Sequence, residues 1–276
     1  MTRHGVWGDR LILGAALLLA AAWVAPLVWV VVLSFKPNAV LMQRTDVLFS
    51  ADFTLKNYAD ILGTSLVFRW LANSVAVAAG QTVLVLLLAS TAGYGFARCE
   101  FPGKRLIFGL VLAGLAVPQA STVIPLHRMF ADWGLHNSAL GLILPGLSAP
   151  FGVFLMTQTF KAIPAELEEA ALLDNASRWR VFWRVMLPLT RPALATLGIF
   201  TFLGAWNDYL WPLISATGAD HYTLTLGLAS TQTNFAQSEG LGYLMAQAVF
   251  AGLPVLVFYA FFQRHIVAAV AGREVR

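Results

Sequence analysis

Six long runs of apolar residues, separated by shorter polar stretches, organise this sequence. The first run, residues 11–33, contains no Asp, Glu, Lys or Arg, and a helix of about 20 apolar residues crosses the hydrocarbon core of a bilayer. Five further runs follow, in which Asp208 is the one charged residue: 71–97, 106–126, 138–160, 193–213 and 241–262. The pattern predicts an all-α membrane protein, with six transmembrane helices in one domain of residues 1–276.

The basic residues indicate how these spans are oriented, because six spans place both ends of a chain on the same side. If the N-terminus is cytoplasmic, 13 of the 18 Lys and Arg residues lie in cytoplasmic segments, as the positive-inside rule requires. The other five would lie outside: Lys36, Arg44, Lys56, Arg69 and Arg128. The sequence therefore predicts cytoplasmic N- and C-termini, and it makes residues 161–192 the longest cytoplasmic loop.

Composition indicates an integral membrane protein, and with the orientation above we expect a multi-pass protein of the cell (inner) membrane. Of the 276 residues 58% are hydrophobic and 12% are charged, against about 25% charged in a soluble domain. The single cysteine, Cys99, excludes an intrachain disulfide. The net charge of +4 is small, and the basic residues stand beside apolar spans rather than in one patch. This distribution points to a membrane and not to nucleic acid.

Small residues and prolines interrupt the apolar runs and bear on how the helices pack. The second run has small residues four apart, which allow a close approach of neighbouring helices: Ala72, Ala76, Gly80, Ala89, Gly93 and Ala97. Prolines fall inside the third, fourth and sixth runs, at Pro118, Pro125, Pro145, Pro150 and Pro254. Kinked helices around a transport cavity explain these prolines, and so do buried structural kinks.

The sequence offers little support for an enzyme. None of the five histidines begins an H-E-x-x-H helix, and no Cys/His cluster has zinc spacing. A Walker A motif is also missing, because Gly103-Lys104 lacks the preceding glycine and the following Ser or Thr. We therefore expect no catalytic residue, metal or cofactor in this chain; if transport uses ATP, a partner binds the ATP and Mg²⁺.

A secondary transporter is a rival of a different class, and it usually carries ionisable residues in mid-membrane. Only Asp208, in the sequence GAWNDYLWPL, lies within a predicted span, and it lies toward the outer end of that span. It is either a substrate contact or a solvated residue of the aromatic belt. Polar and aromatic residues of the third and fifth spans form the candidate substrate pathway: Gln119, Ser121, Thr122, Trp206, Asn207, Asp208, Tyr209 and Trp211.

The cytoplasmic loop 161–192 reads as two helices. Acidic residues follow Pro164, where the helix dipole favours them, and predict a short helix over residues 164–174. A stripe at helical spacing then predicts an amphipathic helix, which Pro188 and Pro192 end: Trp179, Phe182, Trp183 and Met186. Asn175, between the two, tolerates the left-handed conformation of a helix stop. The loop is either an interfacial helix that links spans or a docking helix for a soluble partner.

The stretch EEAALLDNASRWRVFWRVMLPLTRP, residues 168–192, resembles the EAA loop of binding-protein-dependent ABC importer permeases. Glu169-Ala170-Ala171, Asp174 and Leu187-Pro188 match the family pattern, whereas Asn175 stands at the usual glycine position. Further stretches are similar to the carbohydrate-importer (MalG-like) branch: SFKPN, NSVAVA, AGYGFARCEFPGKR, IPL, WNDYLWPL and FFQRHIV.

The resemblance implies a type I permease fold and favours docking as the role of the loop. It implies a second homologous permease, two ATPase subunits that each bind one EAA loop, and an extracytoplasmic solute-binding protein reached by the outer segment 218–240. The implied ATPase-coupling residues are Glu168, Glu169, Ala170, Ala171, Asp174, Asn175, Leu187 and Pro188. A sugar or polyol is the expected substrate. Glycerol 3-phosphate, or another phosphodiester, is the alternative within the branch, although the spans offer no Lys or Arg for a phosphate.

Overall fold

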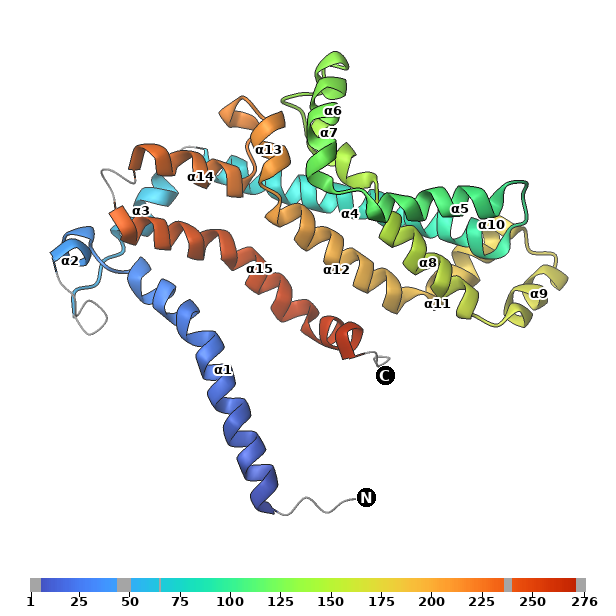
Figure 1. Cartoon of the computed structure of the whole chain (residues 1–276), viewed down its shortest axis with the longest axis horizontal. Coiled ribbons are helices and arrows are strands. Elements are labelled where there is room, and N and C mark those ends of the chain that lie inside the picture. The colour runs from blue at the N-terminus through green and yellow to red at the C-terminus, as the bar shows by residue number, and fades with distance from the viewer. Residues whose placement is uncertain (1–5, 44–50, 65, 236–239, 272–276) are drawn as a thin grey trace. The chain divides into compact units, whose positions relative to one another are not determined.

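The computed structural model describes residues 6–43, 51–64, 66–235 and 240–271, and all the regular structure in these ranges is helical (Figure 1). The chain forms two compact units. One consists of residues 1–67 and 228–254, and the other of residues 68–227 and 255–276. Part of the expected outer segment, residues 236–239, lies outside the described residues, as do Arg3, Arg44, Arg273 and Arg276 of the charge count.

The first unit contains α1 (Val6–Ser34), α2 (Asn38–Gln43) and α3 (Lys56–Gly63), with the end of α14 (Leu224–Phe235) and the start of α15 (Gly240–Ala271). The buried Asn57 side chain joins α3 to the end of α1, because its Nδ2 donates to the carbonyls of Ser34 at 2.8 Å and Lys36 at 3.1 Å. Asn38 Oδ1 in turn accepts a hydrogen bond from Gly242 N at 2.8 Å. These bonds fix the segment that follows α1 against the beginning of α15.

The second unit is built on α4 (Val67–Arg98), a helix of 32 residues. Helices α5 (Lys104–Ala113), α8 (Pro150–Ala162) and α12 (Arg191–Asn207) run beside it (Figure 1). One cluster of buried apolar side chains joins α4, α8 and α12, with Met156, Phe160, Phe182 and Leu197 among its members. A second cluster joins α4 to α6 (Gln119–Asp132), α7 (Ala139–Ile143) and α13 (Leu210–Ser215), where Phe130 meets Trp211 at 5.3 Å between ring centroids.

Three of the expected spans are long helices and three are broken. Helices α1, α4 and α15 are long and apolar enough to cross a membrane. The third expected span bends by 104° between the α5 segment, ending at Ala116, and α6. The fourth bends by 51° between the 3₁₀ turn that ends at Leu147 and α8. The fifth consists of α12 and the short α13, interrupted at Asp208 and Tyr209, and α12 itself is bent by 77° from the helix before it.

Two of these breaks have a local cause. A proline disfavours the helical conformation at the residue before it. Val117, before Pro118, is accordingly extended at φ −81° and ψ 117°, and Ala149, before Pro150, has φ −120° and ψ 66°. Pro125 and Pro254 lie within α6 and α15, which continue through them. Proline therefore interrupts the helix in the third and fourth expected spans but not in the sixth.

The small residues of α4 are used unevenly. Gly93 lies against α8, where an added Cβ would approach Met156 Cβ at 2.6 Å. Ala89 is 1% exposed and lies beside Gly152 of the same helix α8. Ala72 and Ala76, in contrast, are exposed. Among the described residues of this pattern, Ala89 and Gly93 bring α4 close to α8, and Gly80 lies close to α7, where an added Cβ would be 3.0 Å from Ile143 Cδ1.

Candidate functional site

The acidic helix predicted within residues 161–192 is α9, which runs from Ala165 to Leu173 after Pro164. Three backbone hydrogen bonds end it: Asp174 N to Ala170 O at 3.2 Å, Asn175 N to Leu172 O at 3.0 Å and Ala176 N to Ala171 O at 3.2 Å. The last two are the bonds of a Schellman motif, which places its left-handed residue where Asn175 stands. Asn175 has φ 58°, so the expected left-handed turn is present.

Substitutions at Asn175 should separate this backbone role from any side-chain contact. Asn175→Gly should leave the melting temperature of the purified chain nearly unchanged, because glycine adopts positive φ without a steric cost. Asn175→Val should lower the free energy of unfolding by roughly 1–2 kcal/mol, since a β-branched side chain clashes in this conformation. Thermal unfolding in detergent measures both variants. Equal melting temperatures for the valine and glycine variants would contradict the argument.

Glu168 differs from the other acids of α9 because its side chain is buried. It is 8% exposed, and its Oε1 accepts a hydrogen bond from Tyr94 Oη at 2.6 Å. Arg98 Nε lies 3.4 Å from Glu168 Oε2, and Arg98 Nη2 donates to the carbonyls of Phe160, at 2.8 Å, and Ile163. The Tyr94–Arg98–Glu168 cluster thus ties α9 to the end of α4 and to the end of α8. Glu168 therefore offers little surface to a partner.

The second helix of the loop is longer and less regular than expected. It consists of α10 (Arg178–Val181), a π-helical turn (Phe182–Met186) and α11 (Leu187–Leu189). Ser177 caps it, because its Oγ accepts a hydrogen bond from Arg180 N at 3.3 Å. The expectation that Pro188 ends this helix is wrong. A proline ring inside an α-helix clashes with the carbonyl four residues back, and the wide π turn Phe182–Met186 lies where it relieves this clash at Pro188. The helix therefore continues through Pro188 to Leu189, and Thr190 is its C-cap. Pro192 lies in the first turn of α12.

The aromatic stripe of this second helix is divided between two surroundings. Phe182 and Met186 are 1% and 0% exposed and belong to the core cluster, where the Phe182 and Tyr94 rings lie 5.1 Å apart. Trp179 and Trp183 are 64% and 38% exposed, and their rings pack edge to face at 5.7 Å. One side of the helix is therefore fixed on the spans while two tryptophans face outward.

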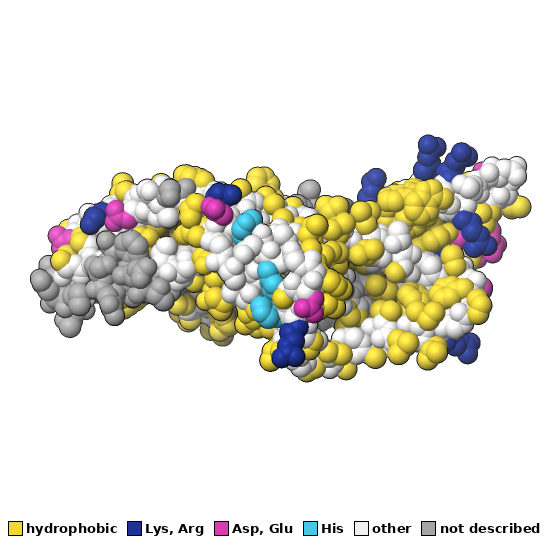
Figure 2. Space-filling view, turned by 90° about the horizontal axis from the view of Figure 1, so that it is seen from above, with side chains coloured by type: hydrophobic (Ala, Val, Ile, Leu, Met, Phe, Trp, Pro, Cys, Tyr) yellow, Lys and Arg dark blue, Asp and Glu magenta, His cyan; other side chains and the backbone are white. Residues whose placement is uncertain are grey.

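The remaining residues that the resemblance implies for ATPase coupling divide by exposure. Glu169, Ala170, Asp174 and Asn175 are exposed, and Leu173 beside them is 84% exposed. Ala171, Leu187 and Pro188 are half-buried, and Ala171 and Leu187 pack against the core cluster. Lys and Arg side chains gather at the end of the second unit where α9 and α10 lie, beyond a largely hydrophobic flank (Figure 2). The exposed part of the loop therefore carries apolar and acidic side chains, and Lys and Arg side chains lie near it.

The candidate substrate residues lie at two helix breaks. Gln119, Ser121 and Thr122 form the first turn of α6, directly after Pro118. Ser121 Oγ donates to Pro118 O at 2.7 Å, and Thr122 Oγ1 donates to Gln119 O at 2.8 Å. Both hydroxyl groups therefore already donate hydrogen bonds to backbone carbonyls of the turn.

The second group surrounds the break between α12 and α13. Trp206 and Trp211 are 3% and 7% exposed, and Trp211 Nε1 donates to Gly141 O at 2.8 Å. These two are packing residues. Asn207 and Tyr209 are exposed, and Asn207 Nδ2 donates to Leu203 O at 2.8 Å. Asp208, half-buried, has its Oδ1 3.4 Å from Trp211 N. Asp208 thus holds the start of α13 rather than standing in the middle of a helix.

Sequence reasoning missed three residues of the loop's attachment: Tyr94, Arg98 and Ser177. Ser177 had a readable signal, because a serine directly before a helix is the preferred N-cap. Tyr94 and Arg98 stand at helical i, i+4 spacing at the end of an apolar span, which marks a shared face. Their partner Glu168, however, is 74 positions away from Tyr94, so the sequence alone could not pair them.

Known proteins resemble this chain along most of its length. Residues 3–272 match the family of binding-protein-dependent transport system inner membrane components. The chain is 36% identical to the diacetylchitobiose uptake system permease protein NgcG of Streptomyces coelicolor, over 90% of this chain and 82% of that protein. It is 33% identical to the trehalose transport system permease protein SugB of Mycobacterium tuberculosis, over 97% and 95%. The crystal structure of a bacterial ABC transporter involved in the import of alginate, an acidic polysaccharide, matches with a TM-score of 0.82 at 24% identity, over 95% of this chain and 99% of that one.

Proposed function

This chain belongs to the family of binding-protein-dependent transport system inner membrane components, and from this we propose that it is the permease subunit of an ATP-driven importer of a sugar or related polyol. The names of the diacetylchitobiose and trehalose permeases support a saccharide substrate. A second homologous permease would complete the pathway, a solute-binding protein would deliver the substrate, and two partner ATPase subunits would bind ATP and Mg²⁺. The chain would then lie in the inner membrane, with both termini on the cytoplasmic side.

The observation that carries this proposal is the construction of the loop 161–192. Its outer surface, with Glu169, Leu173 and Asp174 exposed, is suited to a cleft on a soluble partner. Its inner surface is tied to α4 and α8 through the Tyr94–Arg98–Glu168 cluster. A displacement of α9 by the ATPase would therefore pull on two span helices at once. The loop would thus transmit the ATP-driven closure of the ATPase pair to the spans, which would tilt in response.

Reversing the charge of Glu169 tests the docking surface. We expect Glu169→Lys to lower sugar uptake at least about tenfold in the reconstituted complex, since docked charge pairs contribute on the order of 1.5 kcal/mol or more. The melting temperature of the purified permease should not change, because Glu169 is exposed. Uptake of labelled disaccharide into proteoliposomes, and ATP hydrolysis stimulated by the loaded binding protein, are the measurements.

Glu166→Lys is the matched control. Glu166 lies in the first turn of the same helix and is also exposed, but it stands at the end remote from Leu173 and Asp174. Its reversal should reduce uptake less than that of Glu169. Unchanged uptake and unchanged ATP hydrolysis in Glu169→Lys would remove the proposed coupling role.

A further inference from the structure

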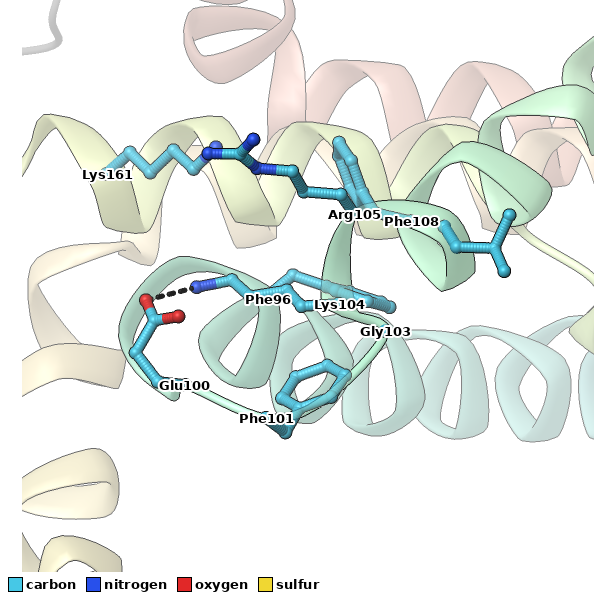
Figure 3. Close-up of a pocket in the computed structure, with 9 residues that line it drawn as sticks. Phe96, Glu100, Phe101, Gly103, Lys104, Arg105, Phe108 and Lys161 are labelled. Carbon is cyan, nitrogen blue, oxygen red and sulfur yellow. Dashed lines mark hydrogen bonds and ion pairs between the residues drawn. The ribbon is translucent and has the colours of Figure 1, made fainter.

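A pocket of about 650 Å³ lies where the end of α4 turns into α5 (Figure 3). Three phenylalanine rings form its apolar wall: Phe96 lies 5.9 Å from Phe101 and 5.1 Å from Phe108 between ring centroids. Lys104, Arg105 and Lys161 line it as well. The pocket lies within the second unit, and Lys161, at the end of α8, is the one residue of the loop 161–192 that lines it.

The basic side chains of this pocket are unequally paired. Lys104 Nζ lies 2.9 Å from Glu100 Oε1 and is therefore neutralised locally. Arg105 and Lys161 have no carboxylate partner within the described ranges. Their side chains extend toward each other in Figure 3, and Lys161 Nζ lies 5.7 Å from the centroid of the Phe108 ring. Two like charges that converge on one pocket repel each other, and a bound anion relieves that repulsion.

Two features of α5 indicate what kind of anion fits. Its first turn, which opens on the pocket after Gly103 at φ 77°, carries no acidic side chain, so the helix dipole also favours a negative group. Leu106 and Leu110, one turn apart on α5, are 69% and 65% exposed. They extend an apolar strip along the span from the pocket. An anion with an attached hydrocarbon chain satisfies both the charge and the strip.

We propose that this pocket binds the phosphate head group of an anionic phospholipid, with Arg105 and Lys161 on the phosphate and an acyl chain along Leu106 and Leu110. Basic pockets between helices at a membrane face bind anionic head groups in this way. The bound lipid would hold the start of α5 against the end of α8, next to the carbonyls that Arg98 engages.

The test uses the full-length permease in nanodiscs that contain equal amounts of phosphatidylglycerol and phosphatidylcholine. Native mass spectrometry after release counts the lipids that stay bound. The wild-type chain should retain one phosphatidylglycerol, and Arg105→Gln with Lys161→Gln should lower this retention by roughly tenfold or more, because each basic residue contributes to binding an anionic lipid. Arg105→Lys with Lys161→Arg should retain the lipid. Excess inorganic phosphate should not displace it.

The control removes the same charge outside the pocket. Arg178→Gln with Arg191→Gln changes two exposed residues of the loop 161–192, and this variant should keep its lipid. Equal loss in both glutamine pairs would overturn the proposal, as would displacement by inorganic phosphate, which indicates a soluble anion. Unchanged lipid retention together with weaker ATPase co-purification in the pocket variant would assign this surface to the ATPase instead.

Discussion

Glu168→Ala is expected to abolish ATP-driven import while the chain still inserts into the membrane. The substitution removes the carboxylate that pairs with Arg98 and accepts a hydrogen bond from Tyr94. Both side chains of the ion pair are nearly enclosed, at 14% exposure for Arg98 and 10% for Glu168. Removing one partner of a buried pair costs about 3–5 kcal/mol, because the other charge stays buried and unpaired. Helix α9 would then lose its polar attachment to α4.

The measurements for Glu168→Ala are sugar uptake by the reconstituted complex and thermal unfolding of the purified permease. We expect uptake to fall to background and the melting temperature to decrease. Glu168→Gln should give an intermediate result, since an amide can keep the Tyr94 hydrogen bond but not the charge. Glu166→Ala, an exposed acid in the same helix, should stay close to wild type. If Glu168→Ala and Glu166→Ala transported equally well, the Tyr94–Arg98–Glu168 cluster would have no part in coupling.

The spans illustrate what local sequence can and cannot specify. The apolar runs placed every long helix, because lipid requires continuous apolar length. The importer-permease fold expected from the resemblance is confirmed by the family match and by the solved transporter. The breaks were not predictable from proline alone. Pro118 and Pro150 start new helices, whereas Pro125 and Pro254 lie inside continuous ones. Which prolines break a helix depends on the tertiary contacts that satisfy the freed carbonyl groups.

The loop 161–192 shows the same limit at the level of single residues. The length of α9 and the left-handed Asn175 followed from local preferences, and both are present. The burial of Glu168 and the exposure of Glu169 could not be predicted from local preferences, because the two are identical residues at adjacent positions. Only the packing of α9 on α4 turns Glu168 toward Tyr94 and Arg98 and leaves Glu169 exposed. The stripe from Trp179 to Met186 is likewise divided between core and surface, and it contains a π turn that its spacing did not predict.

Gly93→Ala should destabilise the permease although it adds a single methyl group to the interior of a helix. That methyl carbon would lie 2.6 Å from Met156 Cβ and 2.9 Å from Thr157 N. Both atoms belong to the close face of α8, so the clash is relieved only if α4 and α8 move apart. Overpacking of this kind costs roughly 1–3 kcal/mol. Gly93→Leu should prevent accumulation of folded protein, because a larger side chain has no space in this contact.

Gly95→Ala separates this steric effect from the general preference of helices for alanine. Gly95 lies two residues away on the same helix, and a Cβ there would meet nothing within 4 Å. Alanine should therefore stabilise this position by roughly 0.5–1 kcal/mol, as it does in most helices. Thermal unfolding of the two purified variants should thus shift in opposite directions. Stabilisation by Gly93→Ala would contradict the close approach of α4 and α8. Because α8 leads directly into the loop 161–192, that contact also determines where α9 is held.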